Sequence, residues 1–81
     1  MKEFIEEIVS SIVPAGQFQV KEDEQDGSFV YTILVSEEDI GKIIGKEGKV
    51  INSIRCLCRV KSLKNKQRVF IKVDKILPSE N

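Results

Sequence analysis

The positions of apolar residues in the first part of the chain predict one helix followed by two strands. Residues 2–13 place apolar side chains at the three- and four-residue intervals of a helix that buries one face. Residues 17–23 alternate between apolar and polar, as in a half-buried edge strand, and residues 29–35 form an apolar run that favours a central strand. Residues 24–28 contain Asp-Gly, a pair typical of a tight hairpin turn. We therefore expect an antiparallel hairpin after the first helix.

The rest of the chain predicts two more helices and a last strand. Ser36 is a typical N-cap residue, and the acids that follow it favour a helix that ends near Ile44. A longer helix is expected over 48–63, and the apolar run at 69–73 predicts the last strand. The stripe that we expect this longer helix to bury consists of Val50, Ile54, Leu57 and Lys61, flanked by Ile51 and Cys58.

The order of these elements predicts a mixed three-stranded sheet. Strand, helix, helix and strand over 29–73 form a crossover long enough to join parallel strands, whereas the hairpin requires an antiparallel pair. We expect the strands to lie in chain order, with all three helices on one face. The chain has 81 residues, which is enough for one small domain. We expect this domain over 1–75 and a frayed tail at 76–81. The predicted fold class is α+β, in the order α-β-β-α-α-β.

The segment between the two later helices has the residues of an anion-binding loop. Gly45 and Gly48 are separated by two polar residues, and glycine allows a positive φ angle and the close approach of another backbone. Because a helix is expected to begin after Gly48, its unpaired N–H groups and the positive end of its dipole point into the loop. Lys46 and Lys49 add positive charge, whereas Glu47 removes part of it. These residues therefore predict that the loop binds an anionic group such as phosphate, and that it binds it weakly.

Charge is unevenly distributed along a chain whose formal net charge is zero. Residues 41–68 contain nine lysines and arginines and a single acid, Glu47, so this segment carries a net charge of +8 and the rest of the chain carries −8. Such a polarised domain attracts polyanions to one side. A basic helix face that only meets solvent would give the same pattern, so charge alone leaves both interpretations open.

Residues 43–51, Ile-Ile-Gly-Lys-Glu-Gly-Lys-Val-Ile, resemble the I-I-G-x-x-G-x-x-I signature of the KH domain. KH domains bind RNA, and their GxxG loop clamps the backbone of about four nucleotides. The extra helix and strand before the βααβ core resemble the type II KH arrangement. Chain length and element order are similar to those of the small single-KH-domain RNA-binding proteins of bacteria, the KhpA-like group. The resemblance covers nearly the whole chain.

The resemblance implies that single-stranded RNA lies in a groove with an aliphatic floor beside the loop. In KH domains the loop and first core helix form one side of this groove, and the second core helix and neighbouring strand form the other. The implied RNA-binding residues are Ile40, Ile43, Ile44, Gly45, Lys46, Glu47, Gly48, Lys49, Ile51 and Arg55. The spacing does not say which of the four isoleucines face RNA, and we expect at least two of them to belong to the core instead. Few aromatic residues occur, and their patterns mostly favour core positions, so no stacking platform is expected. They are Phe4, Phe18, Phe29, Tyr31 and Phe70.

The sequence gives little support to an enzyme or to a metal site. There is no histidine, and Gly45-Lys46 lacks the earlier glycine and the following hydroxyl residue of a phosphate-binding P-loop. Cys56 and Cys58 are two apart in a predicted helix, so their side chains diverge, and we expect two reduced thiols packed partly into the core, no metal and no cofactor. Neither a signal peptide nor a membrane-spanning run is recognisable. We expect a cytoplasmic protein that binds neither a membrane nor a small-molecule substrate.

A protein-interaction module is the main alternative to an RNA-binding protein. Such a module would keep the KH shape and use the second core helix or the sheet edge to pair with itself or another protein. The resemblance implies both functions, because KH proteins this small often act as dimers or with a larger KH-containing partner, and pairing raises effective affinity. We therefore expect a homodimer or such a heterodimer, and a role as a post-transcriptional regulator or RNA chaperone.

Overall fold

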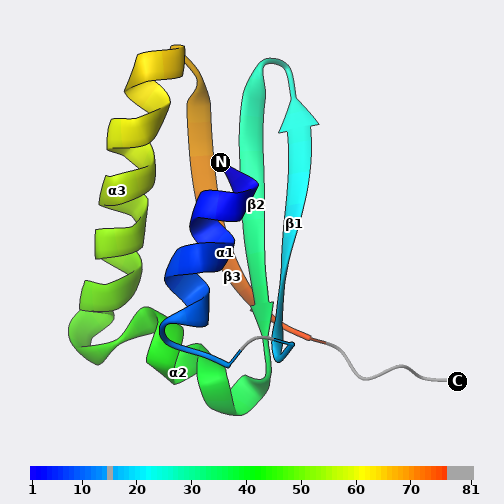
Figure 1. Ribbon diagram of the computed structural model, residues 1–81, viewed down its shortest axis with the longest axis vertical. Helices are drawn as coiled ribbons and strands as arrows, with labels where there is room; N and C mark the ends of the chain where they lie inside the picture. The colour runs from blue at the N-terminus through cyan, green and yellow to red at the C-terminus, as the bar shows by residue number, and fades with distance from the viewer. Residues whose placement is uncertain (15, 77–81) are drawn as a thin grey trace, which may run out of the picture.

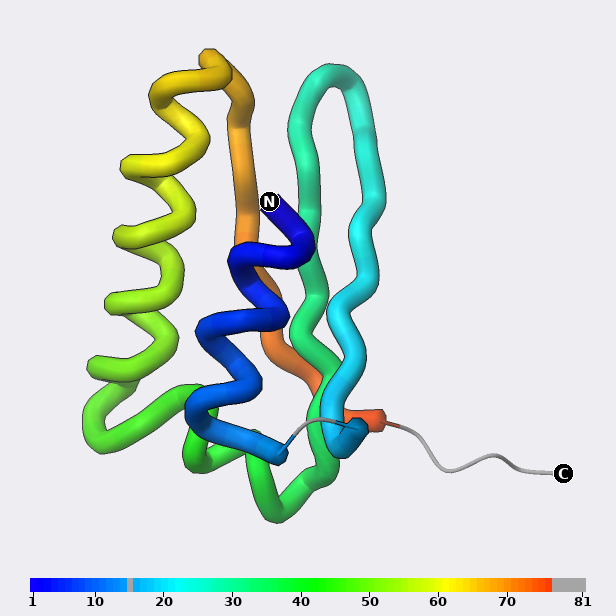
Figure 2. The backbone as a smooth tube through the Cα atoms, viewed as in Figure 1, coloured from blue at the N-terminus to red at the C-terminus, as the bar shows by residue number. Residues whose placement is uncertain are grey.

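Three helices cover one face of a three-stranded sheet in the computed structural model, which describes residues 1–14 and 16–76 (Figure 1). The backbone trace shows the longest helix alongside the sheet, with the loop that precedes it at one end of the domain (Figure 2). The predicted α+β fold class and element order are confirmed. The elements are α1 (Lys2–Ser10), β1 (Phe18–Gln25), β2 (Ser28–Val35), α2 (Glu37–Ile44), the short 3-10 turn η1 (Lys46–Gly48), α3 (Lys49–Asn65) and β3 (Arg68–Lys75).

β2 is the central strand of the sheet. It pairs antiparallel with β1, with Val20 opposite Ile33, and parallel with β3, with Tyr31 opposite Ile71. All four of these side chains are buried, which places them on the face that the helices cover. The sheet is therefore mixed, with its strands in chain order as predicted, and β3 is an edge strand.

The β1–β2 hairpin closes with a two-residue turn at Asp26-Gly27, the pair from which the sequence predicted a tight hairpin. Asp26 and Gly27 have φ angles of 50° and 80°, and Gln25 pairs with Ser28. Positive φ at both central residues is the type I′ geometry, whose twist matches that of the flanking strands. Because the strands can pair right up to this turn, β1 extends two residues beyond its predicted end.

α1 ends at Ser10, three residues before its predicted end. The Ser11 hydroxyl donates a hydrogen bond to the Ile8 carbonyl at 2.6 Å, and such local bonds compete with the helical pattern. Pro14 also disfavours a helical conformation at the residue before it. Val13 is nevertheless fully buried, so the apolar stripe continues past the end of the helix.

The helical face that α3 buries differs from the predicted one. Leu57 is 49% exposed and Lys61 is exposed, although both were expected in the buried stripe. Ile54 is common to the predicted and observed faces, and Ile51 and Cys58, expected only at its flanks, are central to it. The residues that α3 buries are Ile51, Ile54, Cys58 and Ser62. Together with residues of α1, α2 and the covered face of the sheet they form one core.

α3 continues to Asn65, two residues beyond its predicted end. Lys66 then takes a left-handed conformation, with φ 54° and ψ 39°, and the Gln67 amide donates to the Ser62 carbonyl at 3.2 Å. This is a Schellman-type helix end, in which a residue beyond the helix satisfies a carbonyl of the last turn. The helix therefore needs no glycine or proline to stop.

β3 is longer than the predicted strand at 69–73. The Ile76 amide donates to the Val35 carbonyl at 2.8 Å, so residue 76 is tied to β2 and is not part of a frayed tail. The rest of the predicted tail, 77–81, lies outside the described residues. Among the residues that the structure covers, no helix is both long enough and apolar enough to cross a bilayer.

Candidate nucleic-acid interface

The loop between α2 and α3 turns sharply because three of its four residues have positive φ angles. Gly45 has φ 77° and ψ 176°, a combination that is almost restricted to glycine, and Gly48 has φ 74° and ψ 14°. Glu47 between them is left-handed at φ 58°. A Cβ atom on Gly45 would lie 2.9 Å from the backbone nitrogen of Val50. Gly45 therefore lets the start of α3 approach the loop backbone directly.

The first turn of α3 directs backbone N–H groups toward this loop. α3 has 17 residues and no acid in its first turn, and Gly48 at its N-cap provides no side-chain hydrogen bond. The helix dipole therefore leaves partial positive charge at the loop. Lys46, Glu47 and Lys49 are exposed around it. The structure thus brings the predicted loop residues together, with two cations and one carboxylate beside a helix N-terminus that can accept an anion.

Ser36 occupies the N-cap position of α2 as predicted, but its side chain does not cap the helix. Its hydroxyl donates to the Asp39 carboxylate at 2.9 Å instead of accepting from a backbone N–H. Lys42 also forms an ion pair with Asp39 at 3.4 Å. Asp39 is only 8% exposed, and these two partners compensate its burial. This acid is therefore a structural group at the start of α2.

The four isoleucines that the resemblance placed near RNA divide into two pairs. Ile43 is fully buried and Ile51 is 6% exposed, so both are core residues. Ile44, next to Gly45 at the end of α2, is 38% exposed, and Ile40, one turn earlier, is partly buried. Of the four, Ile40 and Ile44 can therefore present apolar surface to a ligand, while the other two support that surface from below.

A groove of about 290 Å³ lies between α3 and β3. Arg55 bridges the two elements, because its Nε and Nη2 atoms donate to the Ile71 carbonyl at 3.4 and 3.3 Å. An edge strand otherwise presents such carbonyls to solvent. Arg55 therefore lies in this groove and is bound to β3, whereas the groove that the resemblance implied would also have the loop and α2 on one side. The lining residues are Arg55, Arg59, Val69, Phe70, Ile71 and Lys72.

Several groove residues were missed by the sequence analysis. Arg59 lies one helical turn beyond Arg55 on the same side of α3. Arg68, Phe70 and Lys72 alternate along β3, so their side chains share one face of that strand. The four-residue and two-residue spacings were the signals that could have found them. A second hollow continues the groove and is lined by Arg59, Ser62, Leu63, Gln67, Arg68, Val69 and Phe70.

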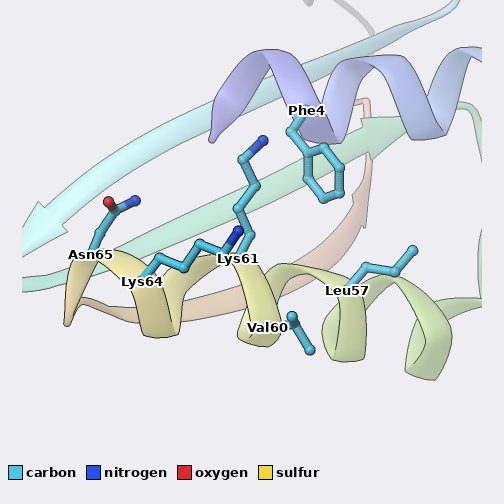
Figure 3. Close-up of a pocket in the computed structure, with 6 residues that line it drawn as sticks. All are labelled: Phe4, Leu57, Val60, Lys61, Lys64 and Asn65. Carbon is cyan, nitrogen blue, oxygen red and sulfur yellow. The ribbon is translucent and has the colours of Figure 1, made fainter.

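An apolar hollow of about 490 Å³ lies on the other side of α3, next to α1 (Figure 3). Phe4 projects from α1 toward α3, and Lys61 Nζ lies 4.3 Å from the centre of its ring. Leu57 and Val60 are 49% and 57% exposed at this surface. These residues are candidates for contact with another protein. The lining residues are Phe4, Leu57, Val60, Lys61, Lys64 and Asn65, which we call the α1–α3 hollow.

The two cysteines occupy different environments. Cys58 is buried and Cys56 is exposed, so their side chains diverge as predicted, and only one of them packs into the core. Burial raises the pKa of the Cys58 thiol, which therefore stays protonated at neutral pH and is a poor nucleophile. Within the described part of the chain, no three histidine, cysteine or acidic residues are grouped to hold a metal ion.

Comparison with known proteins gives extended matches. A family described as "KhpA/KhpB, KH domain" matches residues 2–73. The RNA-binding protein KhpA of Clostridium acetobutylicum is 32% identical over 74 residues, which cover 90% of this chain and 99% of that protein. The RNA-binding protein KhpA of Chlamydia pneumoniae is 36% identical over 74 residues, covering 90% and 95%. That of Thermotoga maritima is 43% identical over 58 residues, covering 70% and 77%. The matched span includes the glycine loop, both core helices and most of the sheet, and the chain belongs to the KhpA/KhpB KH-domain family.

Proposed function

We propose that this protein binds single-stranded RNA and that Gly45-Lys46-Glu47-Gly48, which we call the clamp loop, holds the sugar-phosphate backbone. The observation that carries the proposal is the geometry of this loop. Two glycines with positive φ angles keep its backbone accessible, and the N-terminus of α3 and two exposed lysines supply positive charge. The relatives that are named RNA-binding proteins support the same function.

Single strands should bind better than duplexes. Ile40 and Ile44 offer apolar surface next to the clamp loop, and only unpaired, splayed bases can reach such a surface. Arg55 and Arg59 extend the positive charge along α3 beyond the loop. The path therefore suits a strand whose phosphates face the cations and whose bases face the isoleucines.

The loop itself should bind weakly. Glu47 offsets part of the charge of Lys46, and one KH domain clamps only about four nucleotides. If the loop contacts two phosphates, log K should fall with log salt at about −0.7 per phosphate, which is a shallow dependence. A weak contact releases RNA readily, which suits a post-transcriptional regulator or RNA chaperone in the cytoplasm. These roles require no cofactor and no catalytic group.

The test is the double variant Lys46→Asp and Glu47→Asp, which places two carboxylates where phosphate would lie. Both residues are exposed, so the change in the free energy of unfolding should be only about 0.5 kcal/mol. We expect most of the affinity for single-stranded RNA to be lost and the remaining salt dependence to be shallower. Binding and circular dichroism should be measured on the same preparations.

The chain contains a matched control at the start of α1. Lys2 and Glu3 are an adjacent, exposed Lys-Glu pair, so Lys2→Asp with Glu3→Asp makes the same chemical change outside the loop. This control should bind RNA as the parent does. If the folded loop variant also binds like the parent, the clamp loop is not the RNA site. The basic face of α3 then binds the RNA, or the natural partner of this domain is a protein.

A second proposal follows from the α1–α3 hollow. We infer that it is a pairing surface, used by a second copy of this chain or by a larger KH-containing protein. The supporting observation is that Leu57 and Val60 expose apolar surface beside Phe4, where a solvated helix would ordinarily carry polar residues. Pairing would join two weak RNA sites and raise their effective affinity.

A further inference from the structure

Phe70 is an aromatic side chain on the face of the sheet that the helices leave open. It is 53% exposed, whereas the next residue, Ile71, is 6% exposed and faces the helices. Phe70 is therefore an exception among aromatic residues whose patterns mostly favour the core. Its partner across the sheet is Val30, which is also on the open face. Core packing thus does not explain why a large aromatic occupies this position.

Four cations surround Phe70. Arg68 and Lys72 are two residues before and after it on β3, so they share its face of the strand. Arg55 and Arg59 line the adjoining groove from α3. Within the residues that the structure describes, none of these four side chains forms an ion pair. Their charge is therefore available to an anionic ligand.

The acids on the same face are farther from the ring. Val30 lies between Phe70 on β3 and Asp23 on β1. Asp23 is therefore two strands away from Phe70, at roughly 10 Å. Asp74 is four residues along β3, roughly 13 Å away, and its carboxylate accepts the Lys75 amide at 2.8 Å. The immediate surroundings of the ring are therefore positive.

One flank of α3 connects the clamp loop with Phe70. Arg55 and Arg59 follow Gly48 by seven and eleven residues, which places them about 10 Å and 16 Å along the helix. Both line the groove whose other side is β3. A nucleic-acid strand that leaves the loop along this flank meets cations at intervals and then reaches the Phe70 ring.

We propose that Phe70 is a base-stacking platform, on which a nucleobase next to those held at the clamp loop lies flat, while Arg59 and Arg68 bind the neighbouring phosphates. This inference rests on the proposed RNA binding and extends its site onto the open face of the sheet. Stacking on an aromatic ring accepts every base, because each base has a π face. Leu63, 70% exposed in the same hollow, adds apolar surface at the edge of the platform.

The chemistry of this patch favours RNA over a protein partner. The centres of protein interfaces are depleted in charged residues, whereas Phe70 is the one large aromatic among four cations. An aromatic ring within a positively charged groove is the combination by which proteins bind single strands without sequence preference.

The first experiment combines a protein variant with abasic RNA. Phe70→Leu keeps an apolar side chain in β3 but removes the flat ring. For an eight-nucleotide oligouridine we expect it to bind about fivefold to a hundredfold more weakly than the parent, the usual loss for one stacked base. Two RNAs that lack the bases of their first three or last three nucleotides test the cause. The parent should bind one of these two RNAs more weakly than intact oligouridine, by a similar factor. The Phe70→Leu variant should bind that same RNA as tightly as it binds intact oligouridine.

A fluorescence experiment detects stacking directly. The chain has no tryptophan, so Phe70→Trp introduces a single indole at the proposed platform. Titration with oligouridine should quench its fluorescence, since the indole also stacks on bases. Leu57→Trp is the matched control, because Leu57 is 49% exposed but lies in the α1–α3 hollow. Its indole should show no quenching. Circular dichroism of each variant should match the parent.

The outcomes separate this inference from the proposed function. Loss of binding in the clamp-loop variant, with parent-like binding by Phe70→Leu and no quenching in Phe70→Trp, would overturn the platform and leave RNA binding at the loop intact. Loss in Phe70→Leu with a fully active clamp-loop variant would support the platform and refute the clamp. Equal quenching of both indoles would count against the platform. Absence of any RNA binding by the parent would end both proposals.

Discussion

Three glycines within residues 41–48 should respond in three different ways to substitution by alanine. Gly41 lies inside α2, where a Cβ atom would meet nothing within 4 Å. Gly48 has a left-handed φ of 74° but open space around it, with Asn52 Nδ2 the nearest atom at 3.9 Å. Gly45 has a positive φ as well, and its Cβ would lie 2.9 Å from the backbone nitrogen of Val50. That backbone can move only if α3 moves.

The magnitudes follow from these differences. Gly41→Ala should stabilise the fold by about 0.5–1 kcal/mol, because alanine has the higher helix propensity. Gly48→Ala should destabilise it by about 1 kcal/mol, the penalty for a left-handed alanine. Gly45→Ala adds the displacement of α3 to a conformational penalty of about 1–3 kcal/mol, so it should be the most destabilising of the three.

Urea unfolding followed by far-UV circular dichroism would measure this series, since the chain has no tryptophan. In a domain of this size, a change of 1 kcal/mol shifts the melting temperature by about 4–8 °C, so thermal melts should rank the variants in the same order. The reasoning is refuted if Gly45→Ala is no less stable than Gly48→Ala, because the contact with Val50 would then have no energetic effect. A destabilised Gly41→Ala protein would show that α2 depends on that glycine for another reason.

Two further predictions concern the cysteines and the pairing surface. A thiol reagent should label Cys56 rapidly in the folded protein and label Cys58 only after unfolding, because Cys58 is 1% exposed and burial raises its pKa. RNA binding by Cys56→Ser should equal that of the parent, and rapid labelling of both thiols in native buffer would contradict the burial of Cys58. Light scattering should show a dimer that Leu57→Glu converts to monomer, whereas Leu63→Glu, on the β3 side of α3, should leave it intact. The pairing surface would be excluded if the parent stays monomeric and if no KH-containing partner is captured with it from lysate.

The sequence allowed the fold and the loop to be predicted because each depends on local residue chemistry. Asp26-Gly27 requires a hairpin and Gly45 to Gly48 require a sharp loop, wherever the rest of the chain lies. The buried face of α3 could not be predicted in the same way. Apolar residues occur on every side of this helix, and the faces centred on Leu57 and on Cys58 fit the sequence about equally. The packing of α1 and the sheet decides between them.

Phe70 illustrates a second limit of sequence analysis. Val69, Phe70 and Ile71 are three consecutive apolar residues, so the alternation that reveals which side of a strand is buried is hidden. The register with β2 sets the faces, because it places Ile71 opposite the buried Tyr31 and leaves Phe70 on the open side. Spacing could place Arg59 beside Arg55 on α3 and Arg68 beside Phe70 on β3, but that the two elements bring them to one hollow depends on how α3 meets β3.

The position of α3 explains how RNA and a protein partner could be bound at the same time. Arg55 and Arg59 lie on the flank of the helix that faces β3, while Leu57 and Lys61 lie on the flank that faces α1. The buried stripe separates them, since residues two apart on a helix point in directions about 200° apart. A second copy that docks on the α1 flank would therefore leave the β3 groove and the clamp loop open. Two such copies would present two weak RNA sites in one particle, and joining them raises affinity without any new contact to RNA.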